Sequence, residues 1–312
     1  MTFHARLAAA GLMLAALGAC SPESEKKAEA PAPSPAPAVA PAADTYAFRI
    51  GQLEAVALRD GSLHLPAGNT DASPWPNTAE VSALLRASGV TDGTIHLSIQ
   101  PLLVKDGDRT VLIDTGAGGQ MGTEGKLQAS LRAAGVAAAQ VTDILISHAH
   151  GDHVGGLVAN GALVFPNATI RMSIPEWTAL QSDAGMADLV RVITPKVQAF
   201  APGAVVAPNI TAVSLDGHTP GHSGYEIAQG GGQLLYVGDA LHSSILSVQR
   251  PDWRNTWDQD SATAIATRQG LLERGASQNL LIYGNHFPFP GLGRFQRRDD
   301  GFVWAPEPVP AS

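Results

Sequence analysis

Short apolar runs recur along the chain, and segments with helical periodicity lie between them. The runs have the length of buried strands and are expected at residues 46–59, 94–103, 111–113, 141–146, 169–172, 210–215, 225–228, 233–237 and 280–283. Amphipathic helices are expected at residues 125–135, 175–180 and 261–274. Turn sequences between 102–104 and 111–113, and between 225–228 and 233–237, predict two hairpins. The pattern predicts an α/β (α+β) fold.

The densest cluster of reactive side chains is the segment 147–153 (SHAHGDH), directly after the apolar run 144–146. In an extended strand its imidazoles and carboxylate would point to opposite faces and could not converge. The small Ala149 and the flexible Gly151 instead predict a tight loop at the end of the strand. Imidazole nitrogens and carboxylate oxygens are ligands of zinc and related divalent metals, so this loop is interpreted as part of a metal site.

Further candidate residues also follow apolar runs. Asp114 follows the run 111–113, Asp239 follows 233–237, and His286 follows 280–283. His218 lies in the segment DGHTPGHS, after the run 210–215. Strand ends that each deliver one ligand to a shared cleft are what a binuclear metal site requires.

In order along the chain, Asp114, the motif His148-x-His150-x-Asp152-His153, His218, Asp239 and His286 resemble the metallo-β-lactamase-fold hydrolases. The resemblance runs from about residue 52 to residue 308. Segments 238–242 and 285–293, with Trp304 beyond, are similar to the methyl parathion hydrolase branch. The fold that this resemblance implies is a four-layer αβ/βα sandwich.

The resemblance also implies a ligand set for two divalent ions, expected to be Zn²⁺. One ion would be held by His148, His150 and His218, the other by Asp152, His153 and His286, with Asp239 bridging both. Asp114 would orient the histidine loop without binding an ion, and Asp152, Asp239 and Asp114 are the expected catalytic carboxylates. Two ions, these three carboxylates and one bridging hydroxide bring the site close to neutrality, as a partly buried site requires.

The expected activity is hydrolysis of a small molecule by the bridging hydroxide, which attacks an ester, a lactone or a phosphotriester. The sequence contains no Gly-x-Ser-x-Gly elbow for a serine nucleophile, and no dedicated general acid is evident. Substrates with good leaving groups are therefore favoured. Phe287 and Phe289 are predicted to bind substrate because they lie next to His286 in the sequence. The sequence leaves open whether other apolar residues line the pocket or pack in the core: Trp177, Trp253, Trp257 and Leu292.

Composition narrows the range of partners. The net charge of −8 argues against a nucleic-acid substrate, although some relatives of the same fold cleave RNA. The 45% hydrophobic content is sufficient for a packed core, and 312 residues allow one large domain or two small ones.

The first 20 residues have the pattern of a lipoprotein signal peptide. Arg6 precedes an apolar stretch, 7–17, and the segment LGAC ends in Cys20, which is the only cysteine and the expected lipidation site. Ser21 favours an outer-membrane lipoprotein that faces the periplasm. Residues 21–44 are rich in Ala and Pro and are expected to form a disordered tether, which leaves 45–312 as the hydrolase domain.

Several alternatives share part of this pattern. Zinc β-lactamases of this fold usually lack the bridging carboxylate that Asp239 provides. Glyoxalase-II-like thioesterases carry a longer basic C-terminal region and use glutathione, which is scarce outside the cytoplasm. Di-iron oxygen reductases replace the second histidine of the loop with Glu. A metal- or solute-binding lipoprotein is the non-enzymatic alternative.

The remaining histidines have simpler interpretations. His222 and His242 are expected to support the ligands without binding metal themselves. His64 is expected in a loop, and His96 is expected to be a structural residue of a strand.

Overall fold

The structure is a computed structural model, and it describes residues 44–68 and 73–308. These residues fall within one compact unit, Ala43–Ser312. The predicted signal peptide, Cys20 and all but the last residue of the predicted tether lie outside the described residues. Among the described helices, none combines the length and the apolar composition that crossing a membrane requires.

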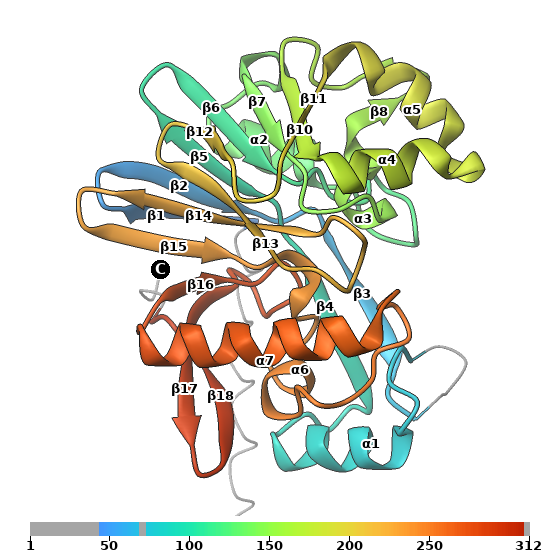
Figure 1. The fold of residues 1–312 in the computed structure, drawn as a ribbon, viewed down its shortest axis with the longest axis vertical. Helices are drawn as coiled ribbons and strands as arrows, with labels where there is room; N and C mark the ends of the chain where they lie inside the picture. Colours follow the sequence, from blue (N-terminus) through green and yellow to red (C-terminus); the bar gives the residue numbers. More distant parts are fainter. Residues whose placement is uncertain (1–43, 69–72, 309–312) are drawn as a thin grey trace, which may run out of the picture. The chain divides into compact units, whose positions relative to one another are not determined.

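Two seven-stranded sheets form the centre of this unit (Figure 1). The first sheet has the strand order β1 (Thr45–Ile50), β2 (Leu53–Leu58), β5 (Leu102–Asp106), β6 (Arg109–Ile113), β7 (Asp143–Leu145), β10 (Thr169–Ser173) and β11 (Val197–Phe200). The second has the order β12 (Val205–Ala207), β13 (Ile210–Ser214), β14 (Ser223–Gln229), β15 (Gly232–Tyr236), β16 (Leu281–Tyr283), β17 (Leu292–Arg298) and β18 (Gly301–Pro306). Two short ribbons pair β3 (Gly61–Pro66) with β4 (Thr94–Ile99), and β8 (Val158–Ala159) with β9 (Ala162–Leu163).

Seven α-helices accompany the sheets in the described part of the chain. They are α1 (Thr78–Ala87), α2 (Leu127–Ala133), α3 (Gly151–Val154), α4 (Ile174–Ser182), α5 (Ala187–Ile193), α6 (Leu246–Gln249) and α7 (Ser261–Ser277). The longest, α7, begins after Asp260, whose carboxylate accepts hydrogen bonds from the backbone N–H groups of Ala262 and Thr263.

The alternation of side chains along the strands divides the core into layers. On β6, Val111 and Ile113 point into the core between the two sheets, whereas Leu112 points into the core beneath α2 and α4. On β15, Tyr236 points between the sheets and Leu235 packs in the core under α7. Both faces of each sheet are therefore covered, which explains the nearly continuous apolar runs in the sequence. The layers are helix, sheet, sheet and helix, and the predicted αβ/βα sandwich is confirmed.

The strand directions explain why the candidate residues meet. In the first sheet β6, β7 and β10 are parallel, so their carboxyl ends lie at one edge. In the second sheet β15 and β16 are parallel, and β13 runs in the same direction because β14 is antiparallel to both β13 and β15. Each segment that carries a candidate residue follows one of these strands, so ligands far apart in the sequence arrive at the same place.

Most predicted elements are present, with four differences, one of which is that the predicted region 94–103 is divided between β4 in a short ribbon and β5 in the first sheet. The hairpins β5–β6 and β14–β15 and the helices α2, α4 and α7 are confirmed. The predicted strand region 46–59 is a hairpin of two strands, β1 and β2. His64 lies in β3 and not in a loop, and Asp152 with His153 lies in the one-turn helix α3 and not in an irregular loop.

Candidate metal centre

Three histidine nitrogens converge at the carboxyl ends of β7 and β13. Nδ1 of His150 lies 3.0 Å from Nε2 of His148 and 3.0 Å from Nε2 of His218. Burial is the main cause that lowers the pKa of all three imidazoles, that of His150 to about 4. These rings are therefore neutral near pH 7, with lone pairs available for a cation.

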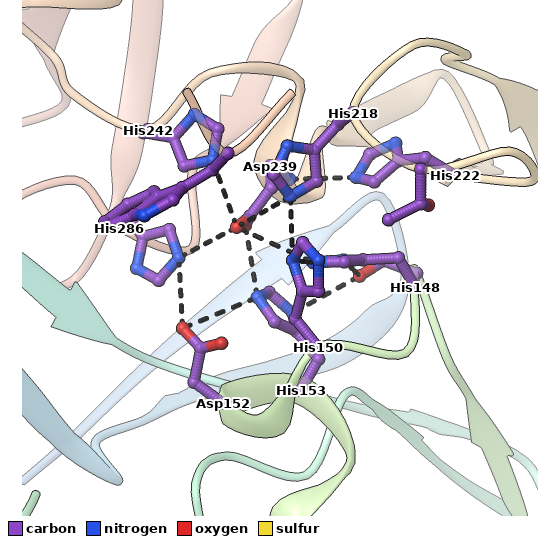
Figure 2. Close-up of polar contacts among 12 residues, drawn as sticks. His148, His150, Asp152, His153, His218, His222, Asp239, His242 and His286 are labelled. Atoms are coloured by element: carbon purple, nitrogen blue, oxygen red, sulfur yellow. Dashed lines mark hydrogen bonds and ion pairs between the residues drawn. The ribbon is translucent and has the colours of Figure 1, made fainter. Parts of the chain in front are cut away.

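A second group of ligand atoms lies beside the first. Asp152 Oδ2 lies 3.4 Å from His286 Nε2 and 3.8 Å from His153 Nε2. Asp239 stands between the two groups, as Figure 2 shows. Its Oδ1 lies 3.2 Å from His153 Nε2 and its Oδ2 lies 3.2 Å from His286 Nε2, while Oδ2 is also 3.7 Å from the Nε2 atoms of both His148 and His218. The seven predicted ligands thus form two neighbouring sets with one shared carboxylate.

The charges around Asp239 favour a cation in this place. Burial alone would raise the pKa of Asp239, but the surrounding imidazoles outweigh burial and hold it well below its usual value. Burial alone would likewise lower the pKa of His153, yet Asp239, Asp152 and Asp114 raise it well above its usual value. The pKa of His286 is raised in the same way, mainly by Asp239 against the effect of burial. The buried carboxylates of this cluster therefore stabilise nearby positive charge, which protons or metal ions can supply.

Unpartnered atoms test whether the residues fit a metal. Among the described residues, buried side-chain atoms without a hydrogen-bond partner include His153 Nε2 and Asp239 Oδ1, and both belong to this cluster. Buried polar groups in native proteins are nearly always paired, so these atoms indicate a missing partner. Imidazole nitrogens and carboxylate oxygens that lie within 4.8 Å of one another, in two sets, suit two zinc-like ions. The residues fit the group.

Hydrogen bonds to the outer nitrogens orient the ligand rings. Asp258 lies 3.1 Å from Nδ1 of His218 and is itself paired with the buried guanidinium of Arg268 at 2.8 Å. The Nδ1 of His286 donates to the carbonyl oxygen of Ser98 over 2.8 Å. Since a ring whose Nδ1 is bound outward must present Nε2 inward, these contacts fix which nitrogen faces the centre.

Asp114 makes hydrogen bonds that orient the histidine segment, residues 147–153. Its Oδ2 is 2.7 Å from Nδ1 of His153 and accepts from the hydroxyls of Ser147 and Tyr236, each over 2.7 Å, while its Oδ1 accepts from the N–H of Ser147. The residue has φ 60°, a strained conformation for a side chain other than glycine. Asp114 thus contacts the ligand segment and does not belong to either ligand set, as the resemblance implied.

Glu176 also holds the ligand segments together and was missed in the sequence. It is buried in the first turn of α4, and its Oε1 accepts from the N–H of Ala149 at 2.8 Å. Its Oε2 accepts from the hydroxyl of Thr219 and the N–H of Gly221. The carboxylate therefore joins the segment 148–153 to the segment that carries His218. An acidic residue in the first turn of a helix is too common to have revealed this role.

His222 and His242 both support Asp239. The N–H of Asp239 donates to Nε2 of His222 over 2.9 Å, and Gly238 allows this approach because a Cβ there would lie 2.7 Å from that nitrogen. His242 Nε2 lies 3.4 Å from Asp239 Oδ2. The tautomer of His242 follows from Asn255, whose Oδ1 accepts from the N–H of Trp257, so that its Nδ2 donates to His242 Nδ1. The proton of His242 then lies on Nε2, the nitrogen closer to the carboxylate, although the two groups form no hydrogen bond.

A cavity of about 280 Å³ opens onto the cluster. It is lined by Leu63, Met121, His150, Gly151, Asp152, Asp239, Trp257 and His286. The polar floor is made of predicted ligands, and the apolar wall is made of Leu63, Met121 and Trp257. The three residues of the apolar wall are far apart in the sequence, and the sequence did not predict that they lie together.

Phe287 and Phe289, which were predicted to bind substrate, do not line this cavity. Phe287 is fully buried and its ring packs edge-on against Trp304, 4.7 Å between centroids, in the core under α7. Phe289 packs against the core between the sheets, with the guanidinium of Arg59 4.4 Å from its ring centroid. The chain turns directly after His286, so neighbours in sequence leave the pocket. Trp177 and Trp253 pack in other parts of the core, and of the three tryptophans in question only Trp257 lines the cavity.

The family comparison decides the identity of this site. The model of the metallo-β-lactamase superfamily matches residues 97–286, which include His148 to His153, His218, Asp239 and His286. The chain belongs to the metallo-β-lactamase superfamily. Within this superfamily it is a metal-dependent hydrolase, as the sequence predicted.

Solved structures of superfamily members are similar over most of the chain. AidC, a dizinc quorum-quenching lactonase determined with a product, is 31% identical, with a TM-score of 0.80 over 85% of this chain and 98% of AidC. The hydrolase AbOPH is 26% identical, with a TM-score of 0.79 over 86% of this chain and 99% of AbOPH. The protein YobT of Bacillus subtilis is 27% identical over 165 residues, which are 47% of this chain and 69% of YobT.

Replacing Asp114 tests its effect on the neighbouring ligands. In Asp114→Asn one acceptor oxygen becomes an NH2 donor, so the amide cannot accept from both the N–H of Ser147 and the ring of His153, and that ring loses its charged partner. We expect Zn²⁺ affinity at the weaker of the two sites to fall about 10- to 100-fold in competition with a chromophoric chelator. As a control, Asp143→Asn removes a buried carboxylate paired with Arg109 and Arg171 at the opposite end of β7 and should leave Zn²⁺ affinity unchanged. Equal affinity in Asp114→Asn and the native protein would refute the role.

Proposed function

We propose that this hydrolase cleaves small uncharged lactones and esters with good leaving groups, with phosphotriesters as a related class. The observation that carries the proposal is the pair of ligand sets that share Asp239 and open onto a cavity with an apolar wall. AidC, with 98% of its length covered at 31% identity, is a dizinc lactonase with a bound product, which supports lactones as the first class to test.

The ligand geometry assigns the residues that would hold the metals. His148, His150 and His218 would hold one ion, Asp152, His153 and His286 the other, and Asp239 would contact both. Two divalent ions, proposed to be Zn²⁺, supply hydroxide at neutral pH and polarise the substrate oxygen. The neutral rings of the first set bind without having to release protons, because burial has already lowered their pKa values.

The chain itself supplies position and selectivity. The backbone N–H of Asp239 is held by His222, and the ring of His242 packs 3.4 Å from its carboxylate, so the shared ligand has little freedom. Leu63, Met121 and Trp257 exclude water on one side of the cavity and suit an apolar substituent of the substrate. The acidic net charge of −8 disfavours polyanionic substrates such as nucleic acids.

We also propose that the protein is exported and anchored through a lipid on Cys20. The support is the arrangement of Arg6, the apolar stretch 7–17 and the LGAC segment before Ser21. In cells that process lipoproteins, Cys20→Ser should move the protein from the membrane fraction to the soluble fraction, as followed by immunoblotting. Retention of the variant in the membrane fraction would contradict the proposal.

His148→Ala tests the proposed metal site together with the activity. The variant loses one of three ligands of the first set, so we expect it to lose at least one metal equivalent and to lose turnover about 1,000-fold or more. The assay compares lactones, aryl esters, phosphotriesters and β-lactams with purified enzyme, and metal content is measured by elemental analysis. Unchanged turnover in the variant would refute the assignment. Preferred turnover of β-lactams or thioesters would select the corresponding alternative, and tight binding without turnover would select the non-enzymatic one.

Trp257→Ala tests the apolar wall. Removing this ring should raise KM about tenfold for substrates with a bulky apolar substituent and change kcat little, because such binding is equal in the ground and transition states. Trp177→Ala is the matched control, since Trp177 packs on α4 away from the cavity and its loss should affect stability alone. An unchanged KM in Trp257→Ala would show that the substituent lies elsewhere.

A further inference from the structure

The ribbon β3–β4 carries two exposed histidines that the proposed reaction does not use. His64 on β3 and His96 on β4 are directly opposite each other in the antiparallel register. Their side chains lie on the outer face of the ribbon, and 49% of the His96 side chain is exposed. Leu63, the neighbour of His64, points the other way and lines the cavity of the metal centre. The histidine pair is therefore a separate feature on the opposite side of the same strands.

The inner nitrogens of this pair face each other. Nδ1 of His64 lies 2.9 Å from Nδ1 of His96, and the two rings are nearly perpendicular at 78°. The outer nitrogens each have a polar partner: Asp92 Oδ2 lies 2.6 Å from His96 Nε2, and the hydroxyl of Ser62 lies 3.0 Å from His64 Nε2. A carboxylate on the outer nitrogen of a histidine is the usual support of a metal-binding ring.

The positions of the protons show that both inner nitrogens can become acceptors at once. Asp92 fixes the proton of His96 on Nε2, which leaves a lone pair on its Nδ1. Without a cation, His64 donates from Nδ1 to that lone pair and accepts from Ser62 at Nε2. If His64 takes the other tautomer, its Nε2 donates to the same hydroxyl, since a hydroxyl can donate or accept. The change of tautomer at His64 loses only the hydrogen bond between the two Nδ1 atoms, and a bound metal ion replaces that bond.

We propose that His64 and His96 form a second metal site, on the surface of the ribbon, for Cu²⁺ or a similar nitrogen-binding divalent ion. The two Nδ1 atoms are the protein ligands, and water completes the coordination. The site belongs to neither ligand set of the metal centre, and hydrolysis does not require it.

The spacing and the charges indicate the kind of ion. The two Nδ1 atoms are 2.9 Å apart, so that a small movement of the rings brings both onto one ion. Among the common divalent metals, Cu²⁺ binds nitrogen ligands most tightly. The carboxylate of Asp92, and that of Glu124, which accepts from the N–H of Ser62, add negative charge nearby.

A Cu²⁺ titration of the Zn²⁺-loaded enzyme tests this site. Released Zn²⁺ is measured in parallel, so that exchange at the metal centre is distinguished from binding at the ribbon. We expect one Cu²⁺ to bind without Zn²⁺ release and to give an electron paramagnetic resonance spectrum with nitrogen ligands. His64→Gln and His96→Gln should each weaken this binding more than about tenfold, and Asp92→Asn about tenfold, with lactone or ester hydrolysis unchanged in all three.

A double variant at positions outside the described residues is the control. In protein that keeps residues 1–20, His4→Gln/Cys20→Ser removes two side chains of types that bind copper and should leave the ribbon site intact. The proposal fails if the native enzyme takes up no Cu²⁺, or if uptake is matched by Zn²⁺ release. It fails equally if the double variant His64→Gln/His96→Gln binds Cu²⁺ as tightly as the native enzyme. Circular dichroism of each variant confirms that the fold is retained.

Discussion

One buried carboxylate surrounded by imidazoles is the interaction on which the rest of the structure depends. Asp239 is almost fully buried and faces nitrogen atoms from both ligand sets within 3.2–3.7 Å. A buried charge of this kind is stable only if positive charge is fixed around it. The same carboxylate would be costly in a plain core, but here it lies between two sets of candidate ligands that share it.

The fold meets this requirement by placing strand ends together and then fixing each side chain from behind. Parallel strands of both sheets end at one edge, which brings Asp114, the histidine segment, Asp239 and His286 together. Behind the ligands lies a set of buried acceptors: Asp114, Asp258 and the carbonyl of Ser98 bind outer ring nitrogens, and Glu176 binds the backbone of two ligand segments. The precision of the site therefore comes from residues that contact ligands and not from the ligands alone.

The seven residues now found in the two ligand sets were predicted from the resemblance to the metallo-β-lactamase-fold hydrolases. That resemblance was visible in the sequence because the segments that carry these residues all follow apolar runs, a local pattern. It did not predict Glu176 or Asp258, because their partners are up to 45 residues away and lie on other elements. The cavity wall was missed for the same reason. Phe287 is the opposite case: it is next to His286 in the sequence, but its ring packs against Trp304 and does not line the cavity.

The central claim is that Asp239 separates two metal ions. Anomalous X-ray diffraction at the zinc edge, from crystals of the Zn²⁺-loaded protein, tests it directly. The account predicts two peaks about 3.5–4 Å apart, one beside His148, His150 and His218 and one beside Asp152, His153 and His286, with Asp239 between them. A single peak, or a second peak that does not contact Asp239, would contradict it.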